Sequence, residues 1–273
     1  MRVADLERCQ LNRLLKTSGL RVRTGPVVTC IRSTLAEVRD GLALHYGAHP
    51  AEDKTVFADF HINVDRPRNL RRWVNPQVVF SLDSHQPFAP LPGGQGFPML
   101  EWGMNFCVSA VANQYLILHA AVLERYGRAL ILPAPSGSGK STLCAGLLFR
   151  GWRLLSDELT LLDPQSGQVV PLPRPVSLKN ASIDVLRRFA PKVEFGPIVH
   201  ETMKGSVGHF KPPVDAVRRA AETVIETQPS FDLIYRSLFD LGFEFGGSLH
   251  QLSSSKDGRI LQADSLLVQR ASL

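Results

Sequence analysis

The stretch of sequence that decides the fold class is Ala134-Pro135-Ser136-Gly137-Ser138-Gly139-Lys140-Ser141-Thr142. It follows an apolar run at residues 129–133, typical of a buried strand, and precedes an amphipathic run at residues 141–150, typical of a helix. A strand, a loop rich in glycine and serine, and a helix in this order are the context of a phosphate-binding P-loop. Ala134 stands where the G-x-x-x-x-G-K-S/T pattern has its first glycine.

Each residue type in this loop suits a phosphate ligand. Gly137 and Gly139 let backbone N–H groups turn inward without a Cβ in the way, and a helix N-terminus directs its positive dipole end at the same anion. Lys140 would bring a full charge to the β- and γ-phosphates, and Ser141 would be a ligand of Mg²⁺. We therefore expect ATP and Mg²⁺ to bind residues 134–142. The alternative interpretation is a glycine- and serine-rich turn before an ordinary helix.

A P-loop does not by itself name a reaction. The chain has no LSGGQ-like segment of the kind that ABC-type ATPases use, and no N-K-x-D segment for guanine recognition. On the loop alone, GTPases, ABC-type ATPases and kinases all remain open. The residues on either side of the loop have to discriminate among these classes.

Two flanking segments resemble the HPr serine kinase/phosphorylase family. Residues 118–127 are LHAAVLERYG and residues 150–158 are RGWRLLSDE. His119 lies 21 residues before Lys140, and Asp157 lies 17 residues after it; these are the offsets of that family's catalytic histidine and acid/base aspartate. The resemblance implies an α/β P-loop fold like that of the HPr kinase C-terminal domain and PEP carboxykinase. It also implies that His119, Lys140 and Asp157 are catalytic.

Further segments are similar to the HPr-kinase-related group A proteins, which occur in bacteria with exosortase-type surface-protein systems. They are EWGMN at residues 101–105, RPVSLKN at residues 174–180 and KGSVGHFKPP at residues 204–213. The similarity covers residues 15–213 and does not extend beyond residue 220. The role of the C-terminal region is therefore left open.

Asp157 and His119, the two polar residues on either side of the loop, each allow more than one role. Asp157 follows an apolar strand beside the loop, where it can take the proton of an acceptor hydroxyl that attacks the γ-phosphate. It can instead serve only as a ligand of Mg²⁺, together with Ser141. Glu158 would point to the opposite side of a continuous strand and act structurally. His119 can bind a phosphate or orient Asp157, and the alternative is a core histidine with its hydrogen bonds satisfied.

The chain departs from the HPr kinase pattern at one place. Those kinases have a further metal-binding glutamate, whereas the comparable stretch here, residues 176–180, has no carboxylate. We expect Lys179 to bind phosphate instead, which argues against the reverse, phosphorylase reaction. Lys204, His209 and Lys211 form a second basic group along the sequence, for which a solvated loop is the alternative.

The composition excludes several other classes of protein. The 273-residue chain is 44% hydrophobic and 21% charged, so it can bury a core. Its net charge of +6 is divided equally between residues 1–118 and the remainder, whereas a nucleic-acid footprint needs a concentrated patch. The chain has no bilayer-length apolar run, no signal-peptide pattern at its start, and no metal-ligand spacing of its four cysteines. We expect a cytoplasmic protein with reduced cysteines and with neither membrane insertion nor a nucleic-acid partner.

The remaining patterns predict the elements around the loop. Further helices are expected at residues 4–18, 34–46, 99–118, 182–189, 214–222 and 231–243, and strands at residues 27–31, 56–64, 78–82 and 128–133. Residues 152–162 are expected to form a strand or a hairpin arm. Asp59 and His61 fit strand alternation better than a metal pair. A connection rich in proline and glycine spans residues 87–98. The chain is accordingly expected to comprise an N-terminal α+β accessory lobe, residues 1–109, and a P-loop catalytic domain, residues 110–273.

The function that follows from these observations is an ATP-dependent kinase. It would transfer the γ-phosphate to a serine- or threonine-type hydroxyl of a protein, a peptide or a small molecule. The alternative is a regulatory or assembly module that binds ATP without phosphorylating an acceptor. A third hypothesis, a nucleic-acid-dependent ATPase, conflicts with the evenly spread charge. Assembly into a homo-oligomer stays open, because HPr kinases form hexamers.

Overall fold

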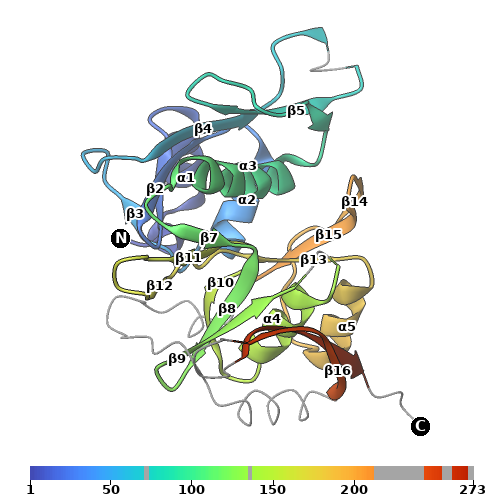
Figure 1. The fold of residues 1–273 in the computed structure, drawn as a ribbon. Helices are drawn as coiled ribbons and strands as arrows, with labels where there is room; N and C mark the ends of the chain where they lie inside the picture. Colours follow the sequence, from blue (N-terminus) through green and yellow to red (C-terminus); the bar gives the residue numbers. More distant parts are fainter. Residues whose placement is uncertain (71–73, 135–136, 212–242, 254–259, 270–273) are drawn as a thin grey trace.

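The structure, a computed structural model, describes residues 1–70, 74–134, 137–211, 243–253 and 260–269. Within these ranges the protein is a mixed α/β fold, as expected, with a six-stranded N-terminal sheet beside a second body of small sheets and helices (Figure 1). None of the helices in the described ranges is both long and apolar enough to cross a bilayer. The region where the two bodies meet positions the candidate site.

The N-terminal sheet has the strand order β3-β1-β2-β4-β5-β6. Its strands are β1 (Leu20–Thr24), β2 (Val27–Arg32), β3 (Ala51–Glu52), β4 (Phe60–Asp65), β5 (Gln77–Leu82) and β6 (Leu91–Pro92). Neighbouring strands are antiparallel, except that β2 and β4 are parallel and are connected through α2 (Ala36–His45). In β4, buried residues alternate with more exposed ones, so one face of the sheet is covered.

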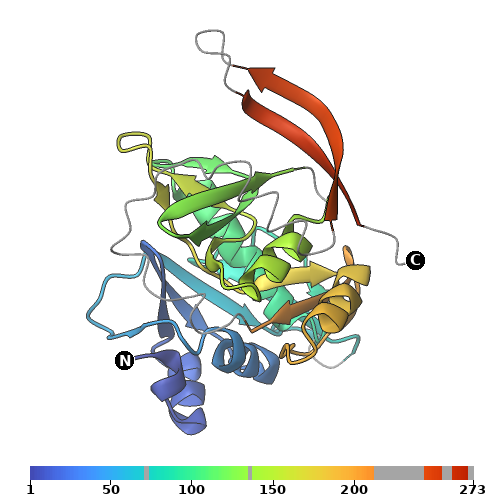
Figure 2. The ribbon, with the colours of Figure 1, turned by 90° about the horizontal axis from the view of Figure 1, so that it is seen from below.

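Helices cover this sheet and form its core with it. They are the short 3₁₀ helix η1 (Val3–Asp5), α1 (Arg8–Lys16), α2 and α3 (Gly96–Val111). Helices α1 and α2 lie side by side (Figure 2), and α3 packs against α2, β4 and β5. At Gly103 of α3 a Cβ would lie 2.0 Å from the Phe80 ring, so the glycine permits this close approach. The same core includes Leu161 and Leu172 from the later part of the chain.

The second body is built from three three-stranded sheets, with the orders β10-β8-β9, β12-β11-β7 and β13-β15-β14. The strands are β7 (Leu116–Leu118), β8 (Ala120–Arg125), β9 (Arg128–Pro133), β10 (Arg153–Ser156), β11 (Thr160–Leu162), β12 (Val169–Val170), β13 (Val176–Lys179), β14 (Val199–Thr202) and β15 (Gly205–Phe210). Helix α4 (Lys140–Leu148) packs on β8, β10, β13 and α5 (Ala181–Phe189). The fully buried Trp152 and Phe210 belong to the core beneath α4.

Several predicted elements are confirmed to within a few residues. They are the strands observed as β2, β5 and β9 and the helices observed as α2, α4 and α5. The predicted helices at residues 214–222 and 231–243 lie outside the described residues, apart from Phe243. That residue is the first of β16 (Phe243–Ser253), which pairs with β17 (Ile260–Gln269).

Two predictions in the first half of the chain are wrong at their boundaries. The single helix expected at residues 4–18 is divided into η1 and α1. The strand expected at residues 56–64 begins only at Phe60. The reason is that the chain turns before it, since the Val56 backbone N–H donates a hydrogen bond to the Asp53 carbonyl over 3.0 Å. Residues 53–56 therefore form a turn and not the start of a strand.

Two further predictions are wrong near the loop. The apolar helix expected at residues 99–118 ends at Val111, and a turn at residues 113–115 leads into β7, which pairs with β11. An apolar run whose one charged residue is Glu101 suits either a helix or a strand, so periodicity could not separate the two. The strand expected at residues 152–162 is interrupted at residues 157–159, between β10 and β11. This interruption carries Asp157 and Glu158.

Candidate functional site

Three strand ends meet at one edge of the β10-β8-β9 sheet. Strand β8 is antiparallel to both neighbours, with Ala120 opposite Pro133 of β9 and Val122 opposite Ser156 of β10. The end of β9, the end of β10 and the start of β8 therefore lie together. This arrangement brings the loop that follows β9 close to Asp157, the residue after β10, and to His119, the residue before β8.

The loop after β9 has the backbone that the motif requires. Gly137 and Gly139 have φ values of +85° and +92°, in the left-handed region that side chains disfavour. Gly139 is the N-cap of α4, which begins at Lys140, one residue earlier than expected. The Lys140 ammonium donates a hydrogen bond to the Ala134 carbonyl and so closes the loop on itself. Residues 135–136 lie outside the described ranges.

The first turn of α4 makes two side-chain contacts with neighbouring elements. The Ser141 hydroxyl donates a hydrogen bond to Asp157 Oδ1 over 3.1 Å. The Thr142 hydroxyl donates to Ser182 Oγ over 2.7 Å, which joins α4 to α5. Ser141 and Asp157, the two residues expected to hold Mg²⁺, are thus held side by side.

The carboxyl group of Asp157 fits a bound Mg²⁺. Asp157 is 9% exposed, and its Oδ2 atom is buried without a hydrogen-bond partner in the described structure. Together with the Ser141 hydroxyl it offers hard oxygen ligands. Mg²⁺ is usually held by one or two such protein ligands together with substrate phosphates and water. The residues present therefore fit a phosphate-bound magnesium ion.

Burial also changes the acidity of this carboxyl group. Burial, reinforced by the nearby charge of Glu158, raises the pKa of Asp157 to about 7, while the Ser141 hydrogen bond opposes the rise. A general base is most useful when its pKa lies near the working pH. In the ligand-free chain, Asp157 therefore has the acidity of a group that can exchange a proton near neutral pH.

Glu158 lies on the same side as Asp157, contrary to the alternation expected of a strand. The reason is that β10 ends at Ser156 and that Glu158 has a φ of +76°, which turns the chain. Its carboxylate accepts a hydrogen bond from Asn105 over 2.6 Å and pairs with Lys179 over 3.4 Å. Burial raises the pKa of Glu158, but the positive charges around it, Lys179 first, outweigh burial and hold the pKa below its usual value.

A buried chain of hydrogen bonds connects Glu158 to the N-terminal lobe. Arg174 donates to Asn105 Oδ1 over 2.8 Å and to Glu101 Oε2 over 2.7 Å. The Tyr46 hydroxyl donates to the other oxygen of Glu101 over 2.6 Å. The side chains of Arg174 and Glu101 are only 6% and 4% exposed. These hydrogen bonds connect α2, α3 and the segment before β13 to the turn that carries Asp157 and Glu158.

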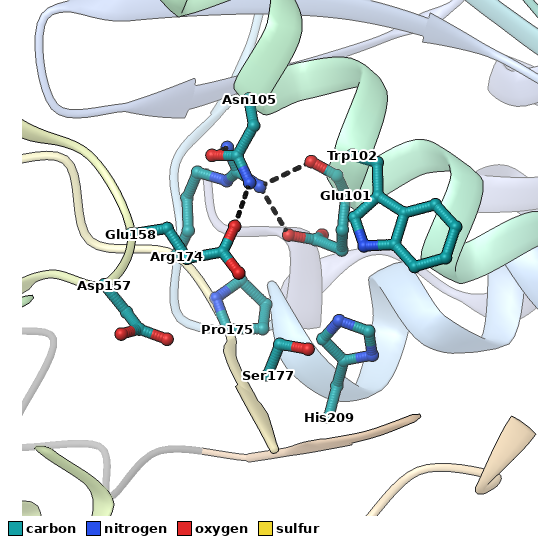
Figure 3. A pocket seen from close by; sticks show the side chains of 9 residues that line it. All are labelled: Glu101, Trp102, Asn105, Asp157, Glu158, Arg174, Pro175, Ser177 and His209. Carbon is teal, nitrogen blue, oxygen red and sulfur yellow. Dashed lines mark hydrogen bonds and ion pairs between the residues drawn. The ribbon is translucent and has the colours of Figure 1, made fainter. Parts of the chain in front are cut away.

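These residues surround a pocket beside Asp157 and Glu158 (Figure 3). Its lining consists of Glu101, Trp102, Asn105, Asp157, Glu158, Arg174, Pro175, Ser177 and His209. The segments that carry the family resemblance, residues 101–105, 150–158 and 174–180, thus converge here. The sequence suggested no site role for Glu101, Asn105, Arg174 or Ser177. The only indication of such a role was that all four residues lie in the segments that carry the family resemblance.

His119 lies outside the pocket lining. It stands between β7 and β8 and is exposed. The alternative of a core histidine is therefore wrong. Because Ala120 pairs with Pro133, the neighbouring His119 lies near the start of the loop that follows β9.

The second basic group predicted from the sequence is not a cluster in the structure. Lys211 pairs with Glu194 over 3.3 Å, and the Lys204 ammonium lies 5.4 Å from the centre of the Trp102 ring. His209 is buried, and burial lowers its pKa to about 3, so the ring is neutral. Lys179, expected to bind phosphate, pairs instead with Glu158 in this structure.

The other metal hypotheses find no support in the described residues. No group of three or more histidine, cysteine or acidic side chains in them is placed to hold a metal ion. The Asp59 carboxylate accepts a hydrogen bond from the Val28 backbone, and His61 lies in β4. The four cysteines are free thiols, of which Cys9 alone is exposed. In comparisons with known proteins, no family model, curated protein or solved structure matches the chain.

Proposed function

We propose that the protein is an ATP-dependent phosphotransferase with a P-loop domain of the HPr-kinase type, acting on a serine- or threonine-type hydroxyl. The observation that carries the proposal is the contact between Ser141 and Asp157 at the start of α4. It joins a P-loop hydroxyl to a buried carboxyl group with a pKa near neutrality. An ordinary turn before a helix does not need such a pair.

The nucleotide would bind to residues 134–142. The backbone N–H groups that Gly137 and Gly139 turn inward, the N-terminus of α4 and the charge of Lys140 would hold its phosphates. Ser141 and Asp157 would hold Mg²⁺, which when bound neutralises charge on the phosphates. His119, exposed at the entry of the loop, would stabilise the charge on the transferring group.

Asp157 would act as the general base. Its carboxylate accepts the proton of the acceptor hydroxyl as that oxygen forms a bond to the γ-phosphorus. The bond from the γ-phosphorus to the bridging oxygen breaks, and ADP leaves with that electron pair. Asp157 then releases the proton to solvent. The buried network behind Glu158 keeps the turn that carries Asp157 in place.

The proposal is tested by transfer of label from γ-³²P-ATP to acceptors in a bacterial lysate. Lys140→Ala and Asp157→Asn are expected to abolish labelling that depends on the protein. The matched controls are Lys192→Ala and Asp184→Asn, which change exposed residues outside residues 134–142. Labelling that persists in both site variants would overturn the proposal. Tight ATP binding with no labelled acceptor would favour the non-catalytic ATP-binding module instead.

A further inference from the structure

The turn that carries Asp157 and Glu158 has a backbone conformation that its residues do not favour. Glu158 has a φ of +76°, in the left-handed region that non-glycine residues seldom adopt. Such a conformation costs free energy and persists only where the surrounding structure fixes it. Asp157, the residue before it, is one of the two side chains proposed to hold Mg²⁺. The contacts that fix Glu158 therefore also affect the metal site.

Both oxygens of the Glu158 carboxylate are engaged by neighbouring elements. Oε2 accepts a hydrogen bond from Asn105 Nδ2 over 2.6 Å, and Oε1 pairs with the Lys179 ammonium over 3.4 Å. Asn105 belongs to α3 of the N-terminal lobe, whereas Lys179 is the last residue of β13 in the second body. Figure 3 shows Asn105 reaching from α3 toward the turn. The shorter of the two contacts thus comes from the N-terminal lobe.

The Asn105 amide can make its contacts in one orientation. Its Oδ1 accepts a hydrogen bond from Arg174 over 2.8 Å, while its Nδ2 donates to Glu158. Arg174 is itself fixed by the buried carboxylate of Glu101 over 2.7 Å. A flipped amide would turn its NH₂ group toward the guanidinium and its oxygen toward the Glu158 carboxylate, and both hydrogen bonds would be lost. Asn105 is therefore held with its donor aimed at Glu158.

We propose that Asn105 is a positioning residue for Asp157, the proposed ligand of Mg²⁺, and that the N-terminal lobe is thereby part of the metal site. Asn105 fixes the Glu158 carboxylate, and Glu158 fixes the turn that directs Asp157 toward Ser141. Asn105 itself would not touch the metal ion. Groups that orient a metal ligand typically contribute about 10- to 100-fold to metal affinity. The inference rests on the proposed function and adds to its site a residue from outside the P-loop body.

The inference is tested by nucleotide binding, which needs neither turnover nor an acceptor. The dissociation constant of a fluorescent ATP analogue is measured on the full chain in EDTA and in saturating MgCl₂. The ratio of the two constants is the magnesium gain. Asn105→Ala is expected to reduce this gain at least about tenfold, while the affinity in EDTA stays at the wild-type value. Asn63→Ala, which changes a half-buried asparagine of β4 in the same lobe, is the matched control.

An exchange of donor and acceptor provides the second arm. Asn105→Asp keeps an acceptor for Arg174 but turns a carboxylate toward Glu158, so their hydrogen bond is lost. The added negative charge alone would strengthen binding of a cation, whereas loss of positioning predicts a smaller magnesium gain, as in Asn105→Ala. Adding Glu158→Gln to Asn105→Asp restores the hydrogen bond with its donor and acceptor exchanged, at the net charge of the wild type. We expect this double variant to recover most of the magnesium gain.

The outcomes separate this inference from the proposed function. A wild-type magnesium gain that Asn105→Ala leaves unchanged overturns the inference, and the nucleotide and metal sites stand. Equal losses of affinity in EDTA and in MgCl₂ would also leave the gain unchanged, and they would show a merely structural role. A larger gain in Asn105→Asp, or a double variant without recovery, overturns the inference as well. If the wild type itself binds no analogue, or binds it without a magnesium gain, the proposed function fails and the inference fails with it.

Discussion

Ser141 and Asp157 are 16 residues apart in the sequence, yet the hydroxyl of one donates to the carboxyl group of the other over 3.1 Å. The contact exists because β9 and β10 both flank β8 and end at the same edge of the sheet. The loop and the acidic turn therefore meet before any ligand is bound. Preorganised polar groups of this kind are what catalysis by electrostatic stabilisation requires.

The buried carboxyl group of Asp157 is expected to cost stability rather than supply it. Asp157→Asn keeps an acceptor for the Ser141 hydroxyl and removes a group whose charged form burial disfavours. In buffer containing EDTA, we therefore expect this variant to unfold at the wild-type temperature or above. Thermal unfolding followed by circular dichroism measures this. A fall of more than about 4 °C would show that the carboxylate stabilises the fold.

The ion pair between Glu101 and Arg174 is expected to be the most sensitive point of the network. Both side chains are almost fully buried, so Glu101→Ala leaves the Arg174 charge uncompensated. Removing one partner of a buried pair typically costs about 3–5 kcal/mol. The matched control is Asp40→Ala, which removes a carboxylate that is 52% exposed and should change stability by about 0.5 kcal/mol or less. Urea denaturation compares the two, and equal effects would contradict the role assigned to burial.

His45 is expected to make the fold sensitive to acid. Burial lowers the pKa of His45 to about 4, from an ordinary value of 6.5. Below pH 6.5 the unfolded chain binds a proton that the folded chain does not, so stability falls with pH until about pH 4. The loss at pH 5 relative to pH 7 is about 2 kcal/mol for this residue.

The measurement is the free energy of unfolding at pH 7 and pH 5 for the wild type and His45→Gln. Other titrating groups, Asp157 included, are the same in both proteins, so the difference between the two pH dependences isolates His45. The variant should lose less stability on acidification. Parallel losses in the two proteins would mean that His45 titrates normally in the fold.

Much of the loop region could be predicted because its signals are local. The glycines at positive φ, the lysine and the helix that follows lie within one short stretch, preceded by an apolar strand. The strand β8 was missed because its first four residues, 120–123, are all apolar and buried. A short, continuously apolar run lacks the alternation that identifies a strand from sequence.

The pocket could not be predicted in the same way. Arg174 bonds to Glu101 across 73 residues, and Asn105 bonds to Glu158 across 53. Such contacts depend on how α3 packs beside the turn after β10, and no local pattern encodes that packing. The orientation of Glu158 was mispredicted for a related reason, since one residue at positive φ reverses the expected alternation.

Gly139 and Gly151 offer a matched pair that separates backbone strain from ligand binding. They flank α4 at φ values of +92° and +82°, and a Cβ at either position would meet no atom within 4 Å. Replacing either by alanine should therefore cost a similar amount, about 1 kcal/mol of stability, from the left-handed conformation alone. Only Gly139 belongs to the proposed phosphate-binding loop, where an added Cβ and a relaxed backbone would turn the N–H groups away from a bound phosphate. We expect Gly139→Ala to weaken binding of a fluorescent ATP analogue more than tenfold, and Gly151→Ala to leave it unchanged. Equal affinities of the two variants would remove the loop from the nucleotide site.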